Sequence, residues 1–281
     1  MIAETKKDGL IYVYALVPTT ENNLIHLNEQ VGIDSKNYIS LKELGPMTAV
    51  ICELDSEKFS VDNIEENTQD PKWLSVKATH HHEVVSLLHT HCTVVPLKFC
   101  TIYSNMNSLR QELEQKQDKL MKLLTRFKKR DGWNVKIYCQ KEKWFSSLEE
   151  QDPTILKQKE KIAKMPPGTQ FLMKKKLKQT LIASVDQHIE QEVQKVHDLL
   201  LKSSDHYNPK KIWNKQVTGK PEEMVWSGVY LVHNEEAIEN FRKIIENIQL
   251  DLGQYGVKID LTGPWPPYDF LDIDCEEIAI E

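Results

Sequence analysis

Residues 79–92 read THHHEVVSLLHTHC and hold five of the ten histidines and one of the five cysteines of the chain. Imidazole and thiolate groups are common ligands of zinc and other transition metals. Two side chains on one helix can bind the same ion only when they lie three or four residues apart, as in the H-E-x-x-H motif. No two of these five histidines have that spacing, and His82 and His89, which do share a face, lie two helical turns apart. The spacing therefore predicts no metal site in this segment.

Other patterns that carry catalysis are also missing from the sequence. It contains no G-x-S-x-G elbow, no Gly-rich phosphate loop and no G-x-G-x-x-G motif. Cys100 has no candidate base beside it in the sequence and is predicted to be an ordinary packed thiol. The cysteines are odd in number and form no C-x-x-C pair, which argues against disulfides and a zinc ribbon and favours a reducing cytoplasm. We therefore expect neither enzyme activity nor a cofactor.

The helix that carries these histidines has a clear start signal, because Asp70 can act as its N-cap and Pro71 as its first residue. His81 falls in the middle of its apolar stripe. We predict a core histidine whose ring nitrogens bond to backbone or to a buried acid, with His80 and His82 off the stripe and solvated. The other stripe residues are Leu74, Ala78, Val84, Val85, Leu88 and Cys92.

Residues 1–130 have the pattern of an α+β domain. A buried strand is predicted over residues 9–18, and two strands joined by Gly45-Pro46 indicate a hairpin. A further strand is predicted over residues 92–99, where Pro96 indicates an edge position or a bulge. A charged helix with apolar side chains at helical spacing is expected from Ser108 to Arg130, with Asn107 as its cap.

Residues 131–263 predict the order β-α-β-β-α-β, a modified ferredoxin-like domain. Its first crossover is enlarged by a helical insertion, about residues 142–203, which we expect to be broken once, at Pro166-Pro167-Gly168. The later arm of this insertion carries one apolar stripe from Leu177 to Leu200. Further strands are predicted at 132–140, around 210–217 and 224–233, and at 256–263, and a helix at 234–253. Residues 264–281 form an acidic tail that we expect to pack between the domains.

Composition limits the classes of partner. The net charge of −6 argues against a nucleic-acid-binding protein, and the lysine-rich run 157–178 is predicted to be a solvated helical face. No 18 apolar residues run together, so no membrane span is expected, and the start of the chain has no signal-peptide pattern.

The segment TGPWPPYDFLDI (262–273) is the remaining unusual feature. Its three prolines are expected to hold Trp265, Tyr268 and Phe270 in an extended segment of low conformational entropy. Rigid aromatic side chains of this kind suit the docking of one domain on the other, or the presentation of an anchor to a partner. Both alternatives remain open from the sequence.

The chain resembles the gas vesicle proteins of the F/L type. Three blocks carry the resemblance: IYVYALV near the start, HHEVVSLLHTHCTVVPLKFCTIY, and TGPWPPYDF, with GWNVKIY as a weaker fourth block. The residues that fall on the two main motifs are His81, Pro96, Leu97, Lys98, Phe99 and Thr101, and Gly263, Pro264, Trp265, Pro266, Pro267, Tyr268 and Phe270.

The sequence departs from the family pattern at two positions. Cys100 stands where the family usually has Gly, and Gly132 stands where it has an acid before the tryptophan. If the missing Gly served a positive φ angle, the turn after Phe99 must have another geometry in this chain.

The resemblance implies a non-enzymatic accessory protein of gas vesicle formation, located at the gas vesicle or in the cytoplasm. Its implied partners are the small hydrophobic shell protein and other accessory proteins, with no nucleic acid and no lipid membrane.

Two alternative functions stay open. A small-molecule or haem enzyme on a ferredoxin-like scaffold would need a histidine such as His81 within reach of solvent, and an RNA-binding module would need salt-sensitive binding.

Overall fold

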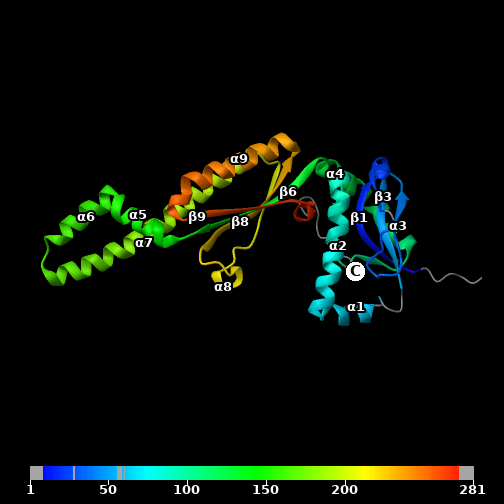
Figure 1. Cartoon of the computed structure of the whole chain (residues 1–281), viewed down its shortest axis with the longest axis horizontal. Coiled ribbons are helices and arrows are strands. Elements are labelled where there is room, and N and C mark those ends of the chain that lie inside the picture. The colour runs from blue at the N-terminus through cyan, green and yellow to red at the C-terminus, as the bar shows by residue number, and fades with distance from the viewer. Residues whose placement is uncertain (1–8, 28, 56–58, 60, 272–281) are drawn as a thin grey trace, which may run out of the picture. The chain divides into compact units, whose positions relative to one another are not determined.

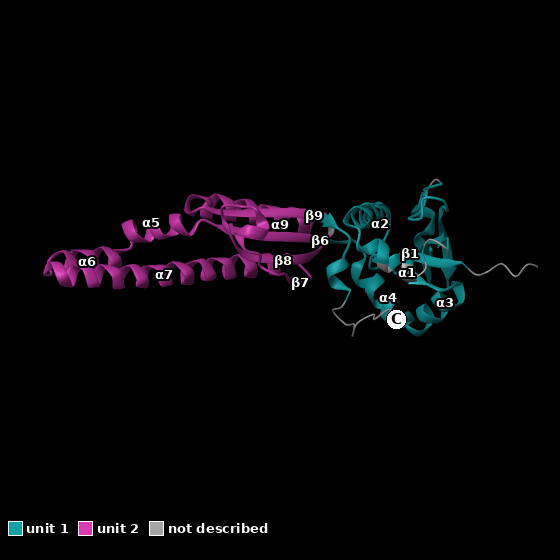
Figure 2. Ribbon diagram, turned by 90° about the horizontal axis from the view of Figure 1, so that it is seen from below, with its two compact units in different colours: residues 1–132, 264–281 teal, residues 133–263 magenta. Residues whose placement is uncertain are grey.

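The computed structural model describes residues 9–271 except residues 28, 56–58 and 60. The chain divides into two compact units (Figure 2): unit 1 consists of residues up to 132 and from 264 onward, and unit 2 of residues 133–263. Residues 264–271 thus pack within unit 1. The acidic residues 272–281, expected to pack between domains, lie outside the described part of the chain.

Unit 1 is built on a sheet whose central strand is β1 (Leu10–Pro18). Among the described residues the strand order is β2-β3-β1-β4, and β5 also pairs with β1. Residues 11–17 of β1 are all buried, as the run of β-branched and aromatic side chains predicts. Gly45, at φ 70°, makes the predicted hairpin turn between β2 and β3. The other strands are β2 (Ile39–Leu44), β3 (Met47–Leu54), β4 (Val95–Pro96) and β5 (Ile102–Tyr103).

A β-bulge in β1 sets the direction of its tyrosines. The register with β3 shifts between Val13 and Ala15, which leaves Tyr14 as the extra residue. Tyr12 and Tyr14 both join the apolar core that contains Val84, Val85 and Leu88 of α2 (Pro71–His91). Pro96 lies on the edge strand β4, as predicted.

The helices of unit 1 confirm one predicted start and correct another. Asp70 caps α2, because its carboxylate accepts a hydrogen bond from the Lys72 N–H at 2.9 Å. The single helix expected over 108–130 is instead two, α3 (Met106–Gln115) and α4 (Gln117–Phe127), since Lys116 leaves the helical conformation at φ −103° and ψ 11°. The cap is Asn105, which forms a capping box with Ser108. Unit 1 also contains η1 (Thr19–Leu24), α1 (Val61–Thr68) and η3 (Tyr268–Phe270).

Unit 2 contains a sheet with the strand order β7-β8-β6-β9. Alternate residues of β6 (Arg130–Cys139) form its core together with the buried stripes of α7 (Pro167–Leu201) and α9 (Asn234–Leu252). The stripe of α7 predicted from Leu177 to Leu200 is buried throughout. The remaining elements here are β7 (His206–Pro209), α8 (Lys215–Thr218), β8 (Glu223–His233), η2 (Gly253–Tyr255) and β9 (Val257–Trp265).

Two predictions for unit 2 were wrong. The strand expected around 210–217 lies earlier, as β7 at 206–209. Residues 215–218 form α8 instead, which Asn214 caps and Gly219, at φ 65°, ends. These two turn-forming residues outweigh the strand preference of the β-branched residues between them. The helical insertion is broken twice rather than once (Figure 1). Asp152 accepts hydrogen bonds from Thr154 and Ile155 N–H and, with Pro153, separates α5 (Lys141–Gln151) from α6 (Pro153–Ala163).

Within the described residues, no helix combines the length and the apolar character that crossing a membrane requires.

Candidate functional site

The structure brings the two main sequence motifs together in unit 1. The His81 ring on α2 lies 6.0 Å from the ring of Phe99 and 6.5 Å from that of Tyr268. It also stacks on Tyr14 at 5.5 Å with an interplanar angle of 20°. We call His81, Tyr12, Tyr14, Phe99 and Tyr268 the aromatic cluster. Motif residues more than 180 positions apart in the sequence therefore form one packed unit.

His81 is a buried histidine with both ring nitrogens bonded, as predicted, but one of the partners is a tyrosine hydroxyl rather than backbone or a buried acid. Its Nε2–H donates to the Leu97 carbonyl at 3.1 Å, and its Nδ1 accepts from the Tyr12 hydroxyl at 2.7 Å. The Tyr12 oxygen in turn accepts from the Cys100 N–H at 3.4 Å. Burial lowers the pKa of His81 to about 4, so this ring is neutral near pH 7. The ring connects α2 to β1 and to the segment after β4.

His80 and His82 lie off the apolar stripe, as predicted, but they are half-buried and contact other residues of unit 1 rather than being fully solvated. His80 Nε2 accepts from the Tyr14 hydroxyl at 3.2 Å, and that hydroxyl accepts from the Ile33 N–H at 2.8 Å. The His82 ring lies 5.5 Å from Trp265 and 6.2 Å from Tyr268. Three consecutive histidines therefore hold three different parts of unit 1, because the sheet and the 264–271 segment cover more of α2 than its apolar stripe.

The GPWPPYDF segment is mostly an internal anchor. Pro266, Pro267 and Phe270 are buried, and Tyr268 is half-buried with a hydroxyl that has no hydrogen-bond partner among the described residues. Trp265 is 37% exposed and is the aromatic side chain of this segment that has substantial area in contact with solvent. Of the other motif residues, Pro96 and Leu97 are buried, Phe99 is half-buried and Lys98 is exposed.

The two departures from the family pattern have structural explanations. Cys100 adopts φ 67°, so the turn after Phe99 keeps the left-handed conformation with a non-Gly residue, and the other geometry that we considered is not found. A Cβ atom on Gly132 would lie 3.2 Å from the Trp265 carbonyl oxygen. Glycine at 132 therefore permits close approach of the 264–271 segment.

The cluster lacks the accessibility that catalysis needs. His81 is 3% exposed, so it does not meet the requirement that a haem or small-molecule enzyme would place on it. Burial raises the pKa of Cys100 to about 11, which keeps the sulfur protonated and weakly nucleophilic. Cys52, Cys92 and Cys139 are likewise free thiols. Over the described residues, no group of three or more His, Cys, Asp or Glu side chains is arranged to hold a metal ion.

Comparison with known proteins identifies the family. The family model described as gas vesicle synthesis protein GvpL/GvpF matches residues 10–272. This chain belongs to the GvpL/GvpF family. Gas vesicle protein L of Streptomyces sp. (strain CB03234) is 24% identical over 271 residues, which cover 96% of each protein. Gas vesicle protein L of Haloferax mediterranei is 24% identical over 201 residues, which cover 68% of this chain and 59% of that protein.

Solved structures of the GvpL/GvpF family share the fold. Gas vesicle protein GvpF from Anabaena sp. PCC7120 has a TM-score of 0.65 at 18% identity, with 94% of this chain and 98% of that chain covered. GvpF from Microcystis aeruginosa has a TM-score of 0.60 at 15% identity, with 93% and 98% covered. Family membership indicates an accessory role in gas vesicles and confirms the resemblance inferred from the motifs.

One exposed surface of this GvpL/GvpF chain was missed in the sequence. Between β7 and β8, Ile212, Trp213 and Val217 are 51%, 42% and 60% exposed. We call residues 210–217 the β7–β8 flap. The Trp213 backbone N–H donates to the Met224 sulfur at 3.4 Å, and Lys211 Nζ lies 4.3 Å from the centroid of the Trp213 ring. A strand was expected over these residues, and the Asn214 cap was the overlooked signal.

Proposed function

We propose that this chain is an accessory protein of gas vesicle assembly that binds the small hydrophobic shell protein and other accessory proteins, at the vesicle or in the cytoplasm. Family membership supports the accessory role. The further step, direct contact with the shell protein, is supported by the apolar surface that the β7–β8 flap leaves in solvent. The strand order β7-β8-β6-β9 supports a ferredoxin-like interpretation of the unit that carries this flap.

The exposed flap is the observation that carries the proposal. Ile212, Trp213 and Met224 line a hollow of about 520 Å³, and charged groups such as Lys215 and Glu223 surround it. An apolar centre that contains a tryptophan, within a charged rim, is the usual arrangement of a protein-binding site. A shell monomer exposes apolar surface before it is assembled, so a partner of this kind could hold it in solution.

The aromatic anchors that we expected in the 264–271 segment contribute less to this proposal. Tyr268 and Phe270 are largely covered within unit 1, and only Trp265 offers an exposed indole. Replacement of Tyr268 would therefore test stability rather than binding. Trp265 remains a second candidate contact for the shell protein or for another accessory protein.

Co-purification with the shell protein tests the function. The full chain is expressed with and without the shell protein at moderate salt, and a stoichiometric complex is expected. The triple variant Ile212→Ser, Trp213→Ala and Val217→Ser should weaken the complex at least tenfold, which corresponds to about 1.4 kcal/mol. Leu250→Ser is the matched control, because Leu250 is 79% exposed on α9, away from the flap in sequence and fold.

Three results would count against the proposal. If both proteins are folded and soluble but form no complex, the partner is another accessory protein. If the triple variant binds as well as Leu250→Ser, the flap is not the contact surface. If Trp265→Ala alone abolishes the complex, the contact lies in unit 1.

A further inference from the structure

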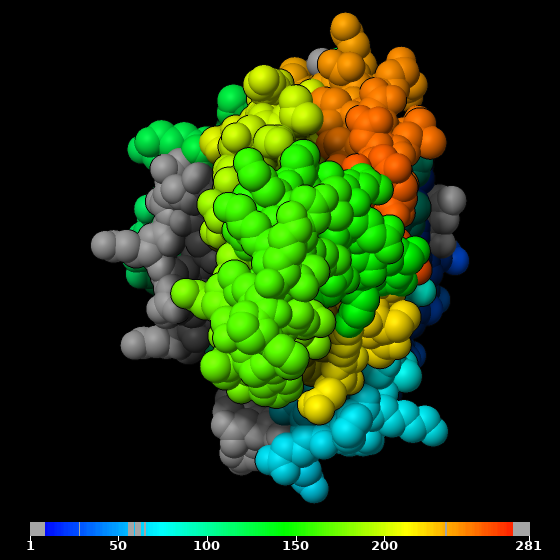
Figure 3. All heavy atoms as spheres, turned by 90° about the vertical axis from the view of Figure 1, so that its left-hand side faces the viewer, coloured from blue at the N-terminus to red at the C-terminus, as the bar shows by residue number. Residues whose placement is uncertain are grey.

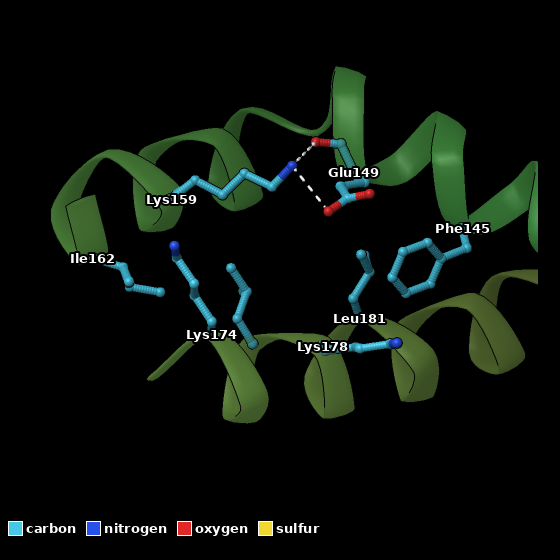
Figure 4. A pocket seen from close by; sticks show the side chains of 8 residues that line it. Phe145, Glu149, Lys159, Ile162, Lys174, Lys178 and Leu181 are labelled. Carbon is cyan, nitrogen blue, oxygen red and sulfur yellow. Dashed lines mark hydrogen bonds and ion pairs between the residues drawn. The ribbon is translucent and has the colours of Figure 1, made fainter. Parts of the chain in front are cut away.

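The helical insertion of unit 2 contains a groove with an unusual lining. A hollow of about 530 Å³ lies among α5, α6 and α7 (Figure 4). Its apolar lining consists of Phe145, Ile162, Leu177 and Leu181, and its charged lining consists of Glu149, Lys159, Lys174 and Lys178. Figure 3 shows the face of the molecule that these helices occupy. We call this hollow the insertion groove.

Positive charge at the insertion groove is poorly neutralised. Lys159 forms an ion pair with Glu149 at 3.1 Å, but no carboxylate of the described residues pairs with Lys174 or Lys178. Residues 157–178 contain eight lysines and one glutamate, which gives a net charge of +7. Because the whole chain carries −6, the other residues together carry −13. Such a concentration of like charge is unfavourable by itself and attracts an anionic ligand.

The same region also exposes apolar side chains. Phe171 and Leu172, at the start of α7, are 71% and 65% exposed. The core between the helices is small, consisting of Ile155, Ile162, Leu177 and Leu181. A nucleic-acid backbone would use the lysines and leave the apolar lining in water, whereas an acidic peptide with apolar side chains would use both. The lining therefore favours an acidic, partly apolar peptide.

One segment of this chain has that composition. Residues 272–281, DIDCEEIAIE, contain five acidic residues and no basic residue, with Ile273, Ile278 and Ile280 among them. They directly follow Phe270 and Leu271, which are buried in unit 1. We propose that the insertion groove binds residues 272–281 of a second copy of this chain, through ion pairs to Lys174 and Lys178 and insertion of isoleucine side chains among the apolar lining.

Chain length favours a second copy over binding within one chain. The chain leaves unit 2 at the end of the sheet where β6 begins, and the groove lies beyond the opposite end, where Lys141 pairs with Asp186 of α7. β6 from Trp133 to Cys139 is about 20 Å long. Leu177 lies a further distance of about 12 Å along α7 from the sheet-packed residues near 185. Within unit 2 the groove therefore lies about 32 Å from the point where the chain leaves this unit. Ten extended residues span at most about 35 Å, and the segment of a second copy is not limited by this length.

A labelled peptide gives the direct test. The probe is residues 272–281 with Cys275→Ser, and the receptor is the chain with residues 272–281 deleted, followed by fluorescence anisotropy. Saturable binding is expected, weakened by salt because two or more ion pairs form. The double variant Lys174→Glu and Lys178→Glu should weaken binding at least tenfold.

Matched variants separate a specific groove from general attraction to the lysine-rich helices. The control variant is Lys175→Glu with Lys202→Glu, which changes the net charge by the same amount. Lys175 lies on α7 and Lys202 directly follows it; both are exposed and neither lines the groove. This control should bind the peptide within about twofold of the parent. A peptide with Glu276→Lys and Glu277→Lys should recover binding to the Lys174→Glu, Lys178→Glu receptor. Equal losses in both double variants would overturn the proposal.

The full chain then decides between a second copy and the same chain. Sedimentation velocity should show association that increases with protein concentration for the full chain and is absent after deletion of residues 272–281. A full chain that stays monomeric overturns the proposal. This holds even if residues 272–281 of the full chain prevent the labelled peptide from binding, because the segment would then occupy the groove of its own chain. Binding of RNA or anionic vesicles that competes with the peptide, without self-association, also overturns it. These measurements use no shell protein, so their failure is distinct from failure of the proposed function.

Discussion

The aromatic cluster of unit 1 and the insertion groove of unit 2 use ionisable groups in opposite ways. In the cluster, His81 is buried and neutral, and each ring nitrogen has a partner. In the groove, Lys174 and Lys178 are exposed and no described carboxylate pairs with them. The cluster contains the recognisable family motifs, yet its contacts are internal. The groove carries no motif but has the unsatisfied charge and apolar area that a ligand could use. Motif residues here indicate packing, and binding capacity has to be sought on the surface.

The largest effect is expected from removal of the His81 ring. His81→Ala leaves the Tyr12 O–H without its acceptor and the Leu97 carbonyl without its imidazole donor, and it opens a cavity, so unit 1 should lose about 3 to 5 kcal/mol of stability. Hydrogen exchange of β1 peptides should show the loss, while β8 peptides of unit 2 serve as an internal control. Unchanged protection of β1 would mean that the cluster does not hold unit 1 together.

Acid should destabilise unit 1 through the same residue. The pKa of His81 is about 4 in the folded state and 6.5 in the unfolded state, so the unfolded chain binds more protons between these values. The contribution of His81 to the free energy of unfolding should not change with pH above pH 6.5. It should fall by about 3 kcal/mol as the pH decreases from 6.5 to 4. His80, whose pKa burial also lowers, adds to this effect.

His81→Gln is the control for the pH experiment, because a glutamine amide can donate to Leu97 and accept from Tyr12 without titrating. Denaturation midpoints of both proteins between pH 7 and 4 give the comparison. An equally steep decrease in the His81→Gln variant would assign the acid sensitivity to other groups.

Two tyrosine-to-phenylalanine changes separate a bonded hydroxyl from an unbonded one. Tyr12→Phe removes the donor to His81 and should cost about 1 to 3 kcal/mol. Tyr268→Phe removes a hydroxyl that has no partner among the described residues and should leave stability unchanged or raise it by up to about 1 kcal/mol. Equal costs for the two variants, measured by urea unfolding, would show that the Tyr268 hydroxyl has a partner such as ordered water.

A smaller effect is expected at the strained turn after Phe99. Cys100→Gly should relieve the cost of φ 67°, and Cys100→Ala loses the sulfur but keeps the strain. The glycine variant should be the more stable of the two by about 1 kcal/mol in thermal unfolding. An alanine variant that is equally stable would mean that the turn rearranges when the sulfur is removed.

The smallest effect is expected in the groove. Lys174→Glu with Lys178→Glu should change the stability of unit 2 by less than about 0.5 kcal/mol, because neither ammonium group has a described carboxylate partner. Thermal unfolding at two salt concentrations checks this. A loss of stability as large as that expected for Tyr12→Phe would show that Lys174 and Lys178 stabilise unit 2. The groove would then resemble the aromatic cluster in having a structural role.

Local signals in the sequence predicted most elements of the fold. The Asp70-Pro71 start of α2, the Gly45 turn and the buried stripe of α7 depend on residues a few positions apart, and all three are found in the structure. The errors arose where two local signals competed. Lys116 interrupts a helical pattern that looked continuous, and Asn214 outweighs the strand propensity of its neighbours.

The candidate sites were only partly predictable. The burial and bonding of His81 followed from its place in the apolar stripe, but its partner Tyr12 lies 69 residues away. Nothing near His80 or His82 in the sequence indicates Tyr14 or Trp265, and both histidines were expected to be solvated. Exposure of Trp213 and burial of Phe270 could not be distinguished either, because each aromatic residue has one apolar and one polar neighbour in the sequence.

The sequence by itself therefore determined the family, the α+β character and the positions of helix starts, turns and stripes, because these depend on short-range spacing and backbone preference. Only the tertiary structure decided that the motifs pack on one another, that Cys100 takes a left-handed conformation, and that the lysines of the insertion surround an apolar groove. Burial and pairing depend on atoms brought together from distant parts of the chain, and one sequence does not record those distances.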